Sequence, residues 1–158
     1  MKRISLCFLF IILSACGANI NVHKPIPNEL ITNSENGGYA TIDVRTSDTE
    51  ASGHFIGAVN KNLKQYLAEL ALYPKINSPL KVRIEITGYH IKTGASRGLM
   101  GSLAGADEVK SIVQVIDTET NKIIGESTVL TSTSMAHGQK AMAWVHADDI
   151  ANFLSGSN

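Results

Sequence analysis

Alternation of apolar and polar residues predicts four β-strands in this chain. The clearest is 80–86, where every second residue is a leucine, valine or isoleucine and the residues between them are charged. Such a period of two buries one face of a strand and leaves the other in water. Strands are also predicted over 39–45, 109–116 and 123–133. A turn at 117–122 joins the last two into a hairpin, and Gly125 is a candidate bulge.

Two stretches have the period of an amphipathic helix. In 59–73, four apolar residues fall at i, i+4, i+7 and i+8, with Asn60 as the expected N-cap and Pro74 as the stop. These four residues are Leu63, Leu67, Leu70 and Ala71. A second helix is expected within 141–154, with Asp148 as its cap or first-turn acid. Its expected core residues are Trp144, Ile150, Phe153 and Leu154.

The order of these elements is strand, helix, strand, glycine-rich connector, strand hairpin and helix. An α+β fold satisfies all of the apolar stripes: a mostly antiparallel sheet of about four strands with two helices packed on one face. The chain has 158 residues, of which 44% are hydrophobic, enough for one domain with a real core.

The first sixteen residues have the pattern of an export signal. Lys2 and Arg3 precede a short apolar run, which is too short for a bilayer span, and Leu13-Ser14-Ala15-Cys16 follows. This tetrapeptide resembles the lipobox of bacterial lipoproteins, which implies cleavage before Cys16 and acylation of that cysteine. By the same resemblance, Gly17 at the next position favours the outer membrane. The alternative is an ordinary secretory signal in which the cysteine is a coincidence.

These observations divide the chain into three parts. We expect a signal peptide at 1–15, a lipidated tether at 16–38, and a periplasmic α+β domain at 39–158. Proline, asparagine and glycine are frequent in 17–39, and no hydrophobic period holds there. An ordered arm packed on the domain remains open for Leu30 and Ile31.

Composition excludes several classes of function. Lys+Arg and Asp+Glu both number 14, which argues against a basic nucleic-acid-binding surface. The two cysteines, Cys7 and Cys16, both lie in the signal region. The mature domain would therefore have no disulfide, no cysteine nucleophile and no thiolate metal site.

Histidines give no convincing metal or hydrolase motif. No His-Glu-x-x-His and no Gly-x-Ser-x-Gly occurs. His146 and Asp149 share one helical face but supply at most two metal ligands, so we expect no metal and no cofactor. A hydrolase that uses His146 and Asp149 is a further hypothesis.

Residues 42–60 resemble the N-terminal half of rhodanese domains. The shared pattern is Ile42-Asp43-Val44-Arg45 followed by Gly53-His54 and Gly57-Ala58-Val59-Asn60. Rhodaneses are sulfurtransferases, but the loop expected to carry their cysteine, 87–94, has none. The resemblance therefore implies no sulfur transfer. Its alternative reading is a degenerate rhodanese-like domain that binds a small anion through Arg45, His54 and Arg97.

The glycine-rich connector 94–107 is the candidate interaction loop. It lacks the lysine of a phosphate-binding loop. Close packing or a flexible connection is one interpretation, and an apolar lip that contacts a partner is the other. The lip would consist of Leu99, Met100 and Leu103, and Arg97 joins them in the candidate interaction loop.

The connector, the strand that ends at Asp117 and the Thr-Glu-Thr-Asn-Lys turn at 118–122 resemble a family of small bacterial outer-membrane lipoproteins. Their domain is similar to those of curli-assembly lipoproteins and to the N-terminal domain of TolB, over residues 39–155. The resemblance implies an envelope role without catalytic residues. We therefore predict a non-enzymatic lipoprotein on the periplasmic face of the outer membrane. Its expected partners are the membrane, through the lipid, and another envelope protein or further copies of itself, but no nucleic acid.

Overall fold

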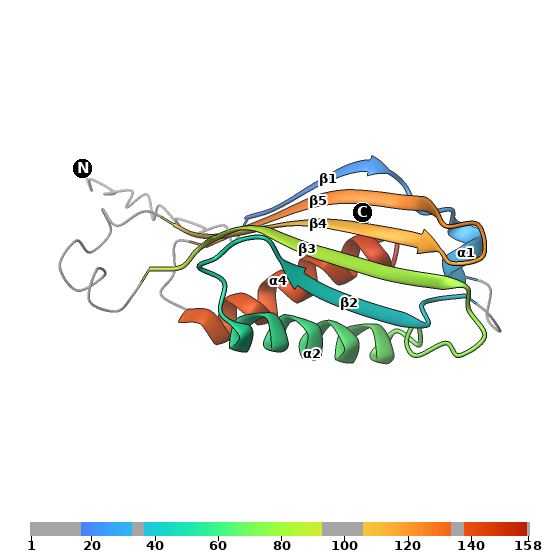
Figure 1. Ribbon diagram of the computed structural model, residues 1–158, viewed down its shortest axis with the longest axis horizontal. Helices are drawn as coiled ribbons and strands as arrows, with labels where there is room; N and C mark the ends of the chain where they lie inside the picture. The colour runs from blue at the N-terminus through green and yellow to red at the C-terminus, as the bar shows by residue number, and fades with distance from the viewer. Residues whose placement is uncertain (1–16, 33–36, 93–105, 134–137, 158) are drawn as a thin grey trace, which may run out of the picture.

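The computed structural model describes residues 17–32, 37–92, 106–133 and 138–157. Five strands and three helices occupy these ranges (Figure 1). The strands are β1 (Gly17–Lys24), β2 (Thr41–Thr46), β3 (Leu80–His90), β4 (Asp107–Asp117) and β5 (Lys122–Thr133). The helices are α1 (Asn28–Thr32), α2 (Gly53–Glu69) and α4 (Gly138–Leu154).

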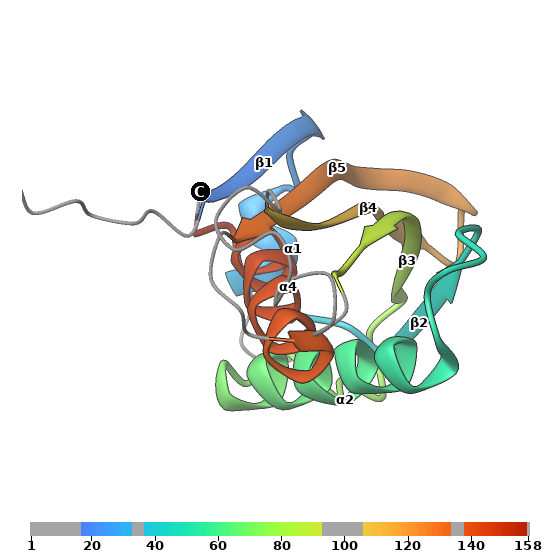
Figure 2. The same cartoon turned by 90° about the vertical axis from the view of Figure 1, so that its left-hand side faces the viewer.

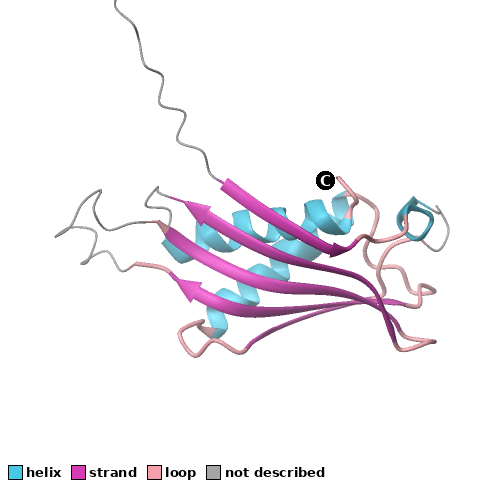
Figure 3. Ribbon diagram, turned by 90° about the horizontal axis from the view of Figure 1, so that it is seen from above, coloured by secondary structure: helices cyan, strands magenta, loops and turns pink. Residues whose placement is uncertain are grey.

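All five strands form one sheet in the order β1-β5-β4-β3-β2. Every neighbouring pair is antiparallel except β2 and β3, which are parallel. Helices α2 and α4 cover one face of this sheet and leave the other face open (Figures 1 and 2). The view from above in Figure 3 looks onto the open face, with both helices behind the strands. The predicted α+β class, with two helices on one face of a mostly antiparallel sheet, is confirmed.

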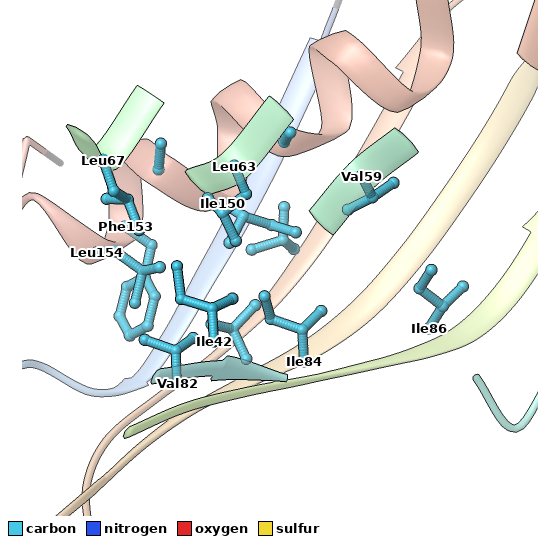
Figure 4. Packing of buried hydrophobic residues seen from close by; sticks show 14 of the residues in the cluster. Ile42, Val59, Leu63, Leu67, Val82, Ile84, Ile86, Ile150, Phe153 and Leu154 are labelled. Carbon is cyan, nitrogen blue, oxygen red and sulfur yellow. The ribbon is translucent and has the colours of Figure 1, made fainter. Parts of the chain in front are cut away.

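The core lies between the sheet and the two long helices. Alternate residues of β3 point into it, and Val82, Ile84 and Ile86 have no exposed surface. Figure 4 shows their side chains on the side of the sheet that faces α2 and α4, the helices that carry Leu63 and Ile150. The residues between them, such as Arg83 and Glu85, are exposed, as the period of two predicted.

The predicted tether is wrong for the first residues after Cys16. Residues 17–24 form β1, which pairs with β5 from Gly17↔Ser132 to Lys24↔Glu126. Helix α1 follows, and Ile31 is buried in the core, as in the alternative left open for that residue. The sheet therefore has five strands instead of four. Ala18, Ile20 and Val22 do alternate with polar residues, but three apolar positions beside a run of loop-forming residues were not enough to predict a strand.

Helix α2 begins six residues before the predicted start. Its N-cap is Ser52, whose Oγ accepts a hydrogen bond from the backbone N–H of Phe55 at 3.2 Å. Asn60, the predicted cap, lies inside the helix. The helix ends at Glu69 before Ala71, which has a left-handed backbone (φ 56°), so Pro74 is not the stop.

In the C-terminal half of the chain, the structure agrees more closely with the elements predicted from the sequence. Asn121 has the left-handed conformation (φ 54°) that the predicted turn needs. The register slips beside Gly125, which confirms the bulge. Ile150, Phe153 and Leu154 of α4 are buried as predicted, but Trp144 is 55% exposed and Asp148 lies in mid-helix. The predictions for Trp144 and Asp148 are therefore wrong.

None of the helices in the described ranges has both the length and the apolar character that a bilayer span needs.

Candidate functional site

An apolar groove lies between the first halves of α2 and α4. It has a volume of about 670 Å³, within the range of about 300–1,000 Å³ typical of small-molecule pockets. On α2, His54, Ala58 and Lys61 line it at i, i+4 and i+7, one face of the helix. On α4 its walls include Lys140 and Trp144.

The charge of the groove has one sign. Three of its nine lining residues, His54, Lys61 and Lys140, carry basic side chains, and none of the nine is acidic. Phe55, another lining residue, packs edge-on against Tyr89 of β3 with ring centroids 4.8 Å apart. The groove therefore combines an apolar surface with a basic rim, which suits an apolar group that has an acidic neighbour.

Sequence reasoning missed this groove for two reasons. The expected helix began at residue 59, which left His54, Phe55 and Ala58 outside it. Trp144 was expected in the core, whereas it is 55% exposed and its ring centroid lies 5.7 Å from that of Tyr66 on α2. The spacing of His54, Ala58 and Lys61 on one helical face was the signal available.

A second cluster of polar groups is enclosed between α4 and the sheet. His146 has no exposed surface, and its Nε2 and Nδ1 lie 2.7 Å from Ser111 Oγ and 2.7 Å from Thr131 Oγ1. Thr131 also donates its hydroxyl proton to Asp149 Oδ2. Burial lowers the pKa of His146 to about 3 and raises the pKa of Asp149.

This cluster has the residue types of a hydrolase but not the access. Ser111 and His146 are completely buried and Asp149 is 6% exposed. A nucleophile has to meet its substrate, so the hydroxyl of Ser111 cannot act as one in this arrangement. Thr131 also lies between His146 and Asp149, where a catalytic triad has direct contact. The geometry gives the hydrolase hypothesis no support.

The three residues of the anion-binding alternative are not brought together. Arg45 lies on the open face of β2, where it pairs with Asp43 at 2.7 Å. His54 lies on α2, which packs on the opposite face of the sheet (Figure 1). Arg97 is outside the described residues.

Cys16 and the candidate interaction residues Arg97, Leu99, Met100 and Leu103 are also outside the described ranges, so their roles stay predictions. Within those ranges, no group of three or more His, Cys, Asp or Glu side chains is arranged to hold a metal ion.

Searches against protein-family models and curated proteins gave no match. Solved structures of PelC share the fold. The PelC L103M dodecamer from Paraburkholderia phytofirmans has 10% identity and a TM-score of 0.56, over 88% of this chain and 98% of that one. A second PelC dodecamer from that organism has 16% identity and a TM-score of 0.51, over 88% and 96%. A candidate lipoprotein from Caulobacter crescentus has 16% identity and a TM-score of 0.43, over 72% and 89%.

Proposed function

We propose that this chain is a bacterial envelope lipoprotein, anchored through Cys16 at the periplasmic face of the outer membrane, and that it acts without catalysis as an assembly module. The observation that carries the proposal is the position of β1. Gly17, the residue after Cys16, is already paired with Ser132 of β5. The described fold thus begins at the residue directly after the one that would bear the lipid.

An anchor without a spacer has a physical consequence. Two or more acyl chains hold a protein stably on a bilayer. A strand joined directly to them keeps the start of the sheet at the membrane surface. Copies held in one layer meet at a higher effective concentration than free copies do, so weak contacts between them suffice for assembly.

Assembly is the role that the fold comparison favours. The same fold, over 88% of this chain, occurs in the two PelC dodecamers. The sheet also has two edge strands, β1 and β2, and sheet edges are common contact surfaces. Among the described residues, the cluster around His146 comes nearest to a hydrolase site, and it is closed to substrate. This supports a role without catalysis.

The anchor is tested with Cys16→Ser in the full chain. We expect labelled palmitate to enter the unaltered chain and Cys7→Ser, the matched control, but not Cys16→Ser. The membrane-bound fraction should fall in the Cys16→Ser chain alone. Equal labelling of all three chains would contradict the proposed anchor.

The assembly role is tested by chemical crosslinking in intact cells. We expect products that contain several copies of the chain, and fewer of them for Cys16→Ser because that chain is no longer concentrated on the membrane. Crosslinking that gives only the monomer at native expression would contradict assembly through self-association.

A further inference from the structure

The groove between α2 and α4 lies at the end of the sheet where β1 begins. Phe55, which lines the groove, packs against Tyr89 of β3. One row of paired residues joins β3, β4, β5 and β1 at this level, and its members are Tyr89, Val109, Thr131 and Ala18. Because neighbouring strands are about 4.8 Å apart, Ala18, the second residue after Cys16, lies about 14 Å from Tyr89 across the sheet.

The start of α4 lies at the same end of the sheet. Ser132 of β5 pairs with Gly17, and β5 ends at Thr133. Helix α4 begins at Gly138, five residues later, so its first residue lies within about 18 Å of Thr133. Figure 1 shows the first residues of β1, α2 and α4 at the left end of the molecule. The groove is therefore close to the residue that would bear the lipid.

The groove attracts an anion. Lys61 and Lys140 are exposed and line it, together with His54. Both α2 and α4 begin at the groove, so the positive ends of their dipoles lie there as well. Lysine side chains and helix N-termini are common binding groups for phosphate. The charge around the groove therefore favours a negatively charged head group.

The acidic side chains nearest to the groove in sequence do not line it. Asp48, which precedes α2, accepts hydrogen bonds from two backbone N–H groups, at 2.8 and 2.9 Å. Glu50 is exposed and also precedes the helix. On α4, Asp148 lies one helical turn beyond Trp144. We therefore expect the head group beside Lys140, at the opposite end of the groove from Asp148.

The interior of the groove suits a hydrocarbon chain. Phe55, Ala58, Ala141 and Trp144 give it an apolar lining, and its volume of about 670 Å³ admits a ligand of small-molecule size. Trp144 is half-exposed, and tryptophan is enriched where a bilayer meets water. An apolar interior with a basic rim matches an amphiphile that has an acidic head.

We propose that the groove binds an anionic phospholipid of the membrane, with one acyl chain between α2 and α4 and the phosphate beside Lys61 and Lys140. The proposal rests on the anchor proposed above, which holds this end of the domain at the bilayer. The acyl chains on Cys16 are the rival occupant. Their ester and amide linkages carry no charge, so the two lysines favour a phospholipid over them.

Trp144 is the only tryptophan of the chain, so its fluorescence reports on the groove. The test uses the full chain with Cys16→Ser, which has no lipid of its own, and short-chain phosphatidylglycerol with brominated acyl chains, kept below the concentration at which it forms micelles. We expect saturable quenching of Trp144. Phosphatidylcholine with the same brominated chains should need about a tenfold higher concentration. Equal quenching by the two lipids, or none by phosphatidylglycerol, would overturn the proposal.

A pair of double variants tests the basic rim. Lys61→Gln with Lys140→Gln should weaken the binding of brominated phosphatidylglycerol about tenfold or more. The control pair, Lys110→Gln with Lys122→Gln, removes the same charge from β4 and β5, where neither lysine lines the groove. It should bind as the parent chain does. Equal weakening by both pairs would show that net charge, and not the groove, attracts the lipid.

A second pair of variants tests the apolar interior. Ala58→Phe puts a large ring into the groove and should abolish saturable quenching. Ala68→Phe, the control, alters an exposed alanine of the same helix that does not line the groove, and it should keep the binding. Urea unfolding of both chains checks that they fold. Binding to Ala58→Phe as tight as to Ala68→Phe would contradict an acyl chain in the groove.

The unaltered chain is tested in vesicles of phosphatidylcholine that contain a minor share of phosphatidylglycerol. Two preparations have the same composition and differ only in which lipid carries the bromine. For each labelled molecule, phosphatidylglycerol should quench Trp144 more strongly than phosphatidylcholine. Quenching in proportion to the share of each lipid would mean unselective contact with the bilayer, and weak quenching by both would mean that the lipid of Cys16 fills the groove. Either result would overturn the proposal.

The anchor and the lipid site can fail separately. If palmitate labels Cys16 but phosphatidylglycerol does not quench Trp144 in the short-chain titration, the site is wrong and the anchor stands. If Cys16→Ser takes up as much palmitate as the unaltered chain while the titration still saturates, the anchor is wrong and the lipid site stands.

Discussion

His146 is the centre of a chain of hydrogen bonds whose proton positions can be deduced. Thr131 has one hydroxyl proton and donates it to Asp149, so it must accept from Nδ1 of His146. The neutral ring then carries its proton on Nδ1, and Nε2 accepts the hydroxyl proton of Ser111. Every bond in the chain thus points from Ser111 toward the carboxylate, which satisfies four buried groups at once.

The buried histidine makes stability depend on pH. Its pKa is lowered to about 3 by burial, while an unfolded histidine titrates near about 6.5. Between these values the unfolded state binds a proton that the folded state does not. His146 therefore costs no stability above about pH 6.5, and it lowers stability as pH falls below that value.

We expect His146→Gln to flatten this dependence. Between pH 6 and pH 5, the free energy of unfolding of the unaltered chain should fall more steeply than that of His146→Gln, by about 1 kcal/mol per pH unit. The raised pKa of Asp149 acts in the opposite direction, and comparison of slopes reduces its influence because both chains retain this carboxyl. Urea unfolding at several pH values measures the two slopes.

The matched control is His54→Gln, which alters an exposed histidine on α2. It should keep the slope of the unaltered chain. A slope for His146→Gln as steep as that of His54→Gln would show that His146 is protonated in the folded state.

The start of α2 shows how an element can be predicted while its boundary is missed. The stripe of Leu63 and Leu67 identified a helix, and both residues are fully buried. The boundary was placed at Asn60 because asparagine is a common cap. The true cap, Ser52, precedes Gly53 and Gly57, two residues that are poor helix formers, so packing of Phe55 and Val59 overrides local preference there.

Two alanine variants distinguish the observed cap, Ser52, from the predicted cap, Asn60. Ser52→Ala should lower the free energy of unfolding by about 1 kcal/mol, since it removes the acceptor for the N–H of Phe55. Asn60→Ala should not lower it, because Asn60 Oδ1 is buried without a hydrogen-bond partner and alanine favours the helix. Chemical denaturation of both chains measures the difference. A larger loss for Asn60→Ala would contradict the observed start of α2.

The arm between β1 and α1 is held by a close approach at the bulge of β5. A Cβ atom added to Gly125 would lie 2.5 Å from Cγ1 of Ile26, which is buried. That contact is too short for real atoms, and a Cβ on Gly57 of α2 would meet nothing within 4 Å. Glycine at 125 therefore fixes where the arm crosses the sheet.

Gly125→Ala should destabilise the chain by about 1–3 kcal/mol, the usual cost of overpacking a core. Adding Ile26→Ala to it should cost less than the sum of the two single changes, since the clash disappears. Gly57→Ala serves as the control and should stabilise the helix slightly. Thermal or urea unfolding of the unaltered chain, the two single variants and the double variant measures this coupling. Strictly additive changes in the free energy of unfolding would exclude the contact.

Across the whole molecule, the sequence predicted those parts in which one local pattern determines the structure. Leu80 to Ile86 alternate regularly, and the hairpin turn has Asn121 where a left-handed residue is needed. The parts that were missed depend on distant partners. β1 pairs with the edge of β5 from Ser132 to Glu126, and the alternation of Ala18, Ile20 and Val22 with polar residues was too short to predict that pairing. The groove likewise joins residues of α2 and α4 that are far apart in sequence.

The absence of a spacer after Cys16 gives a prediction about the anchored molecule. A fluorophore on Ser132→Cys, opposite Gly17 in the sheet, should be strongly quenched by a quencher attached to lipid head groups. A ten-residue glycine-serine insertion between Cys16 and Gly17 reaches about 18 Å on average, so it should reduce the quenching while acylation and folding are kept. The same probe on Glu126→Cys, opposite Lys24 at the far end of β1, distinguishes two orientations. Weak quenching there means that β1 rises from the membrane, and strong quenching means that it lies along the surface. Quenching at Ser132 that the insertion leaves unchanged would contradict a direct join between the lipid and the sheet.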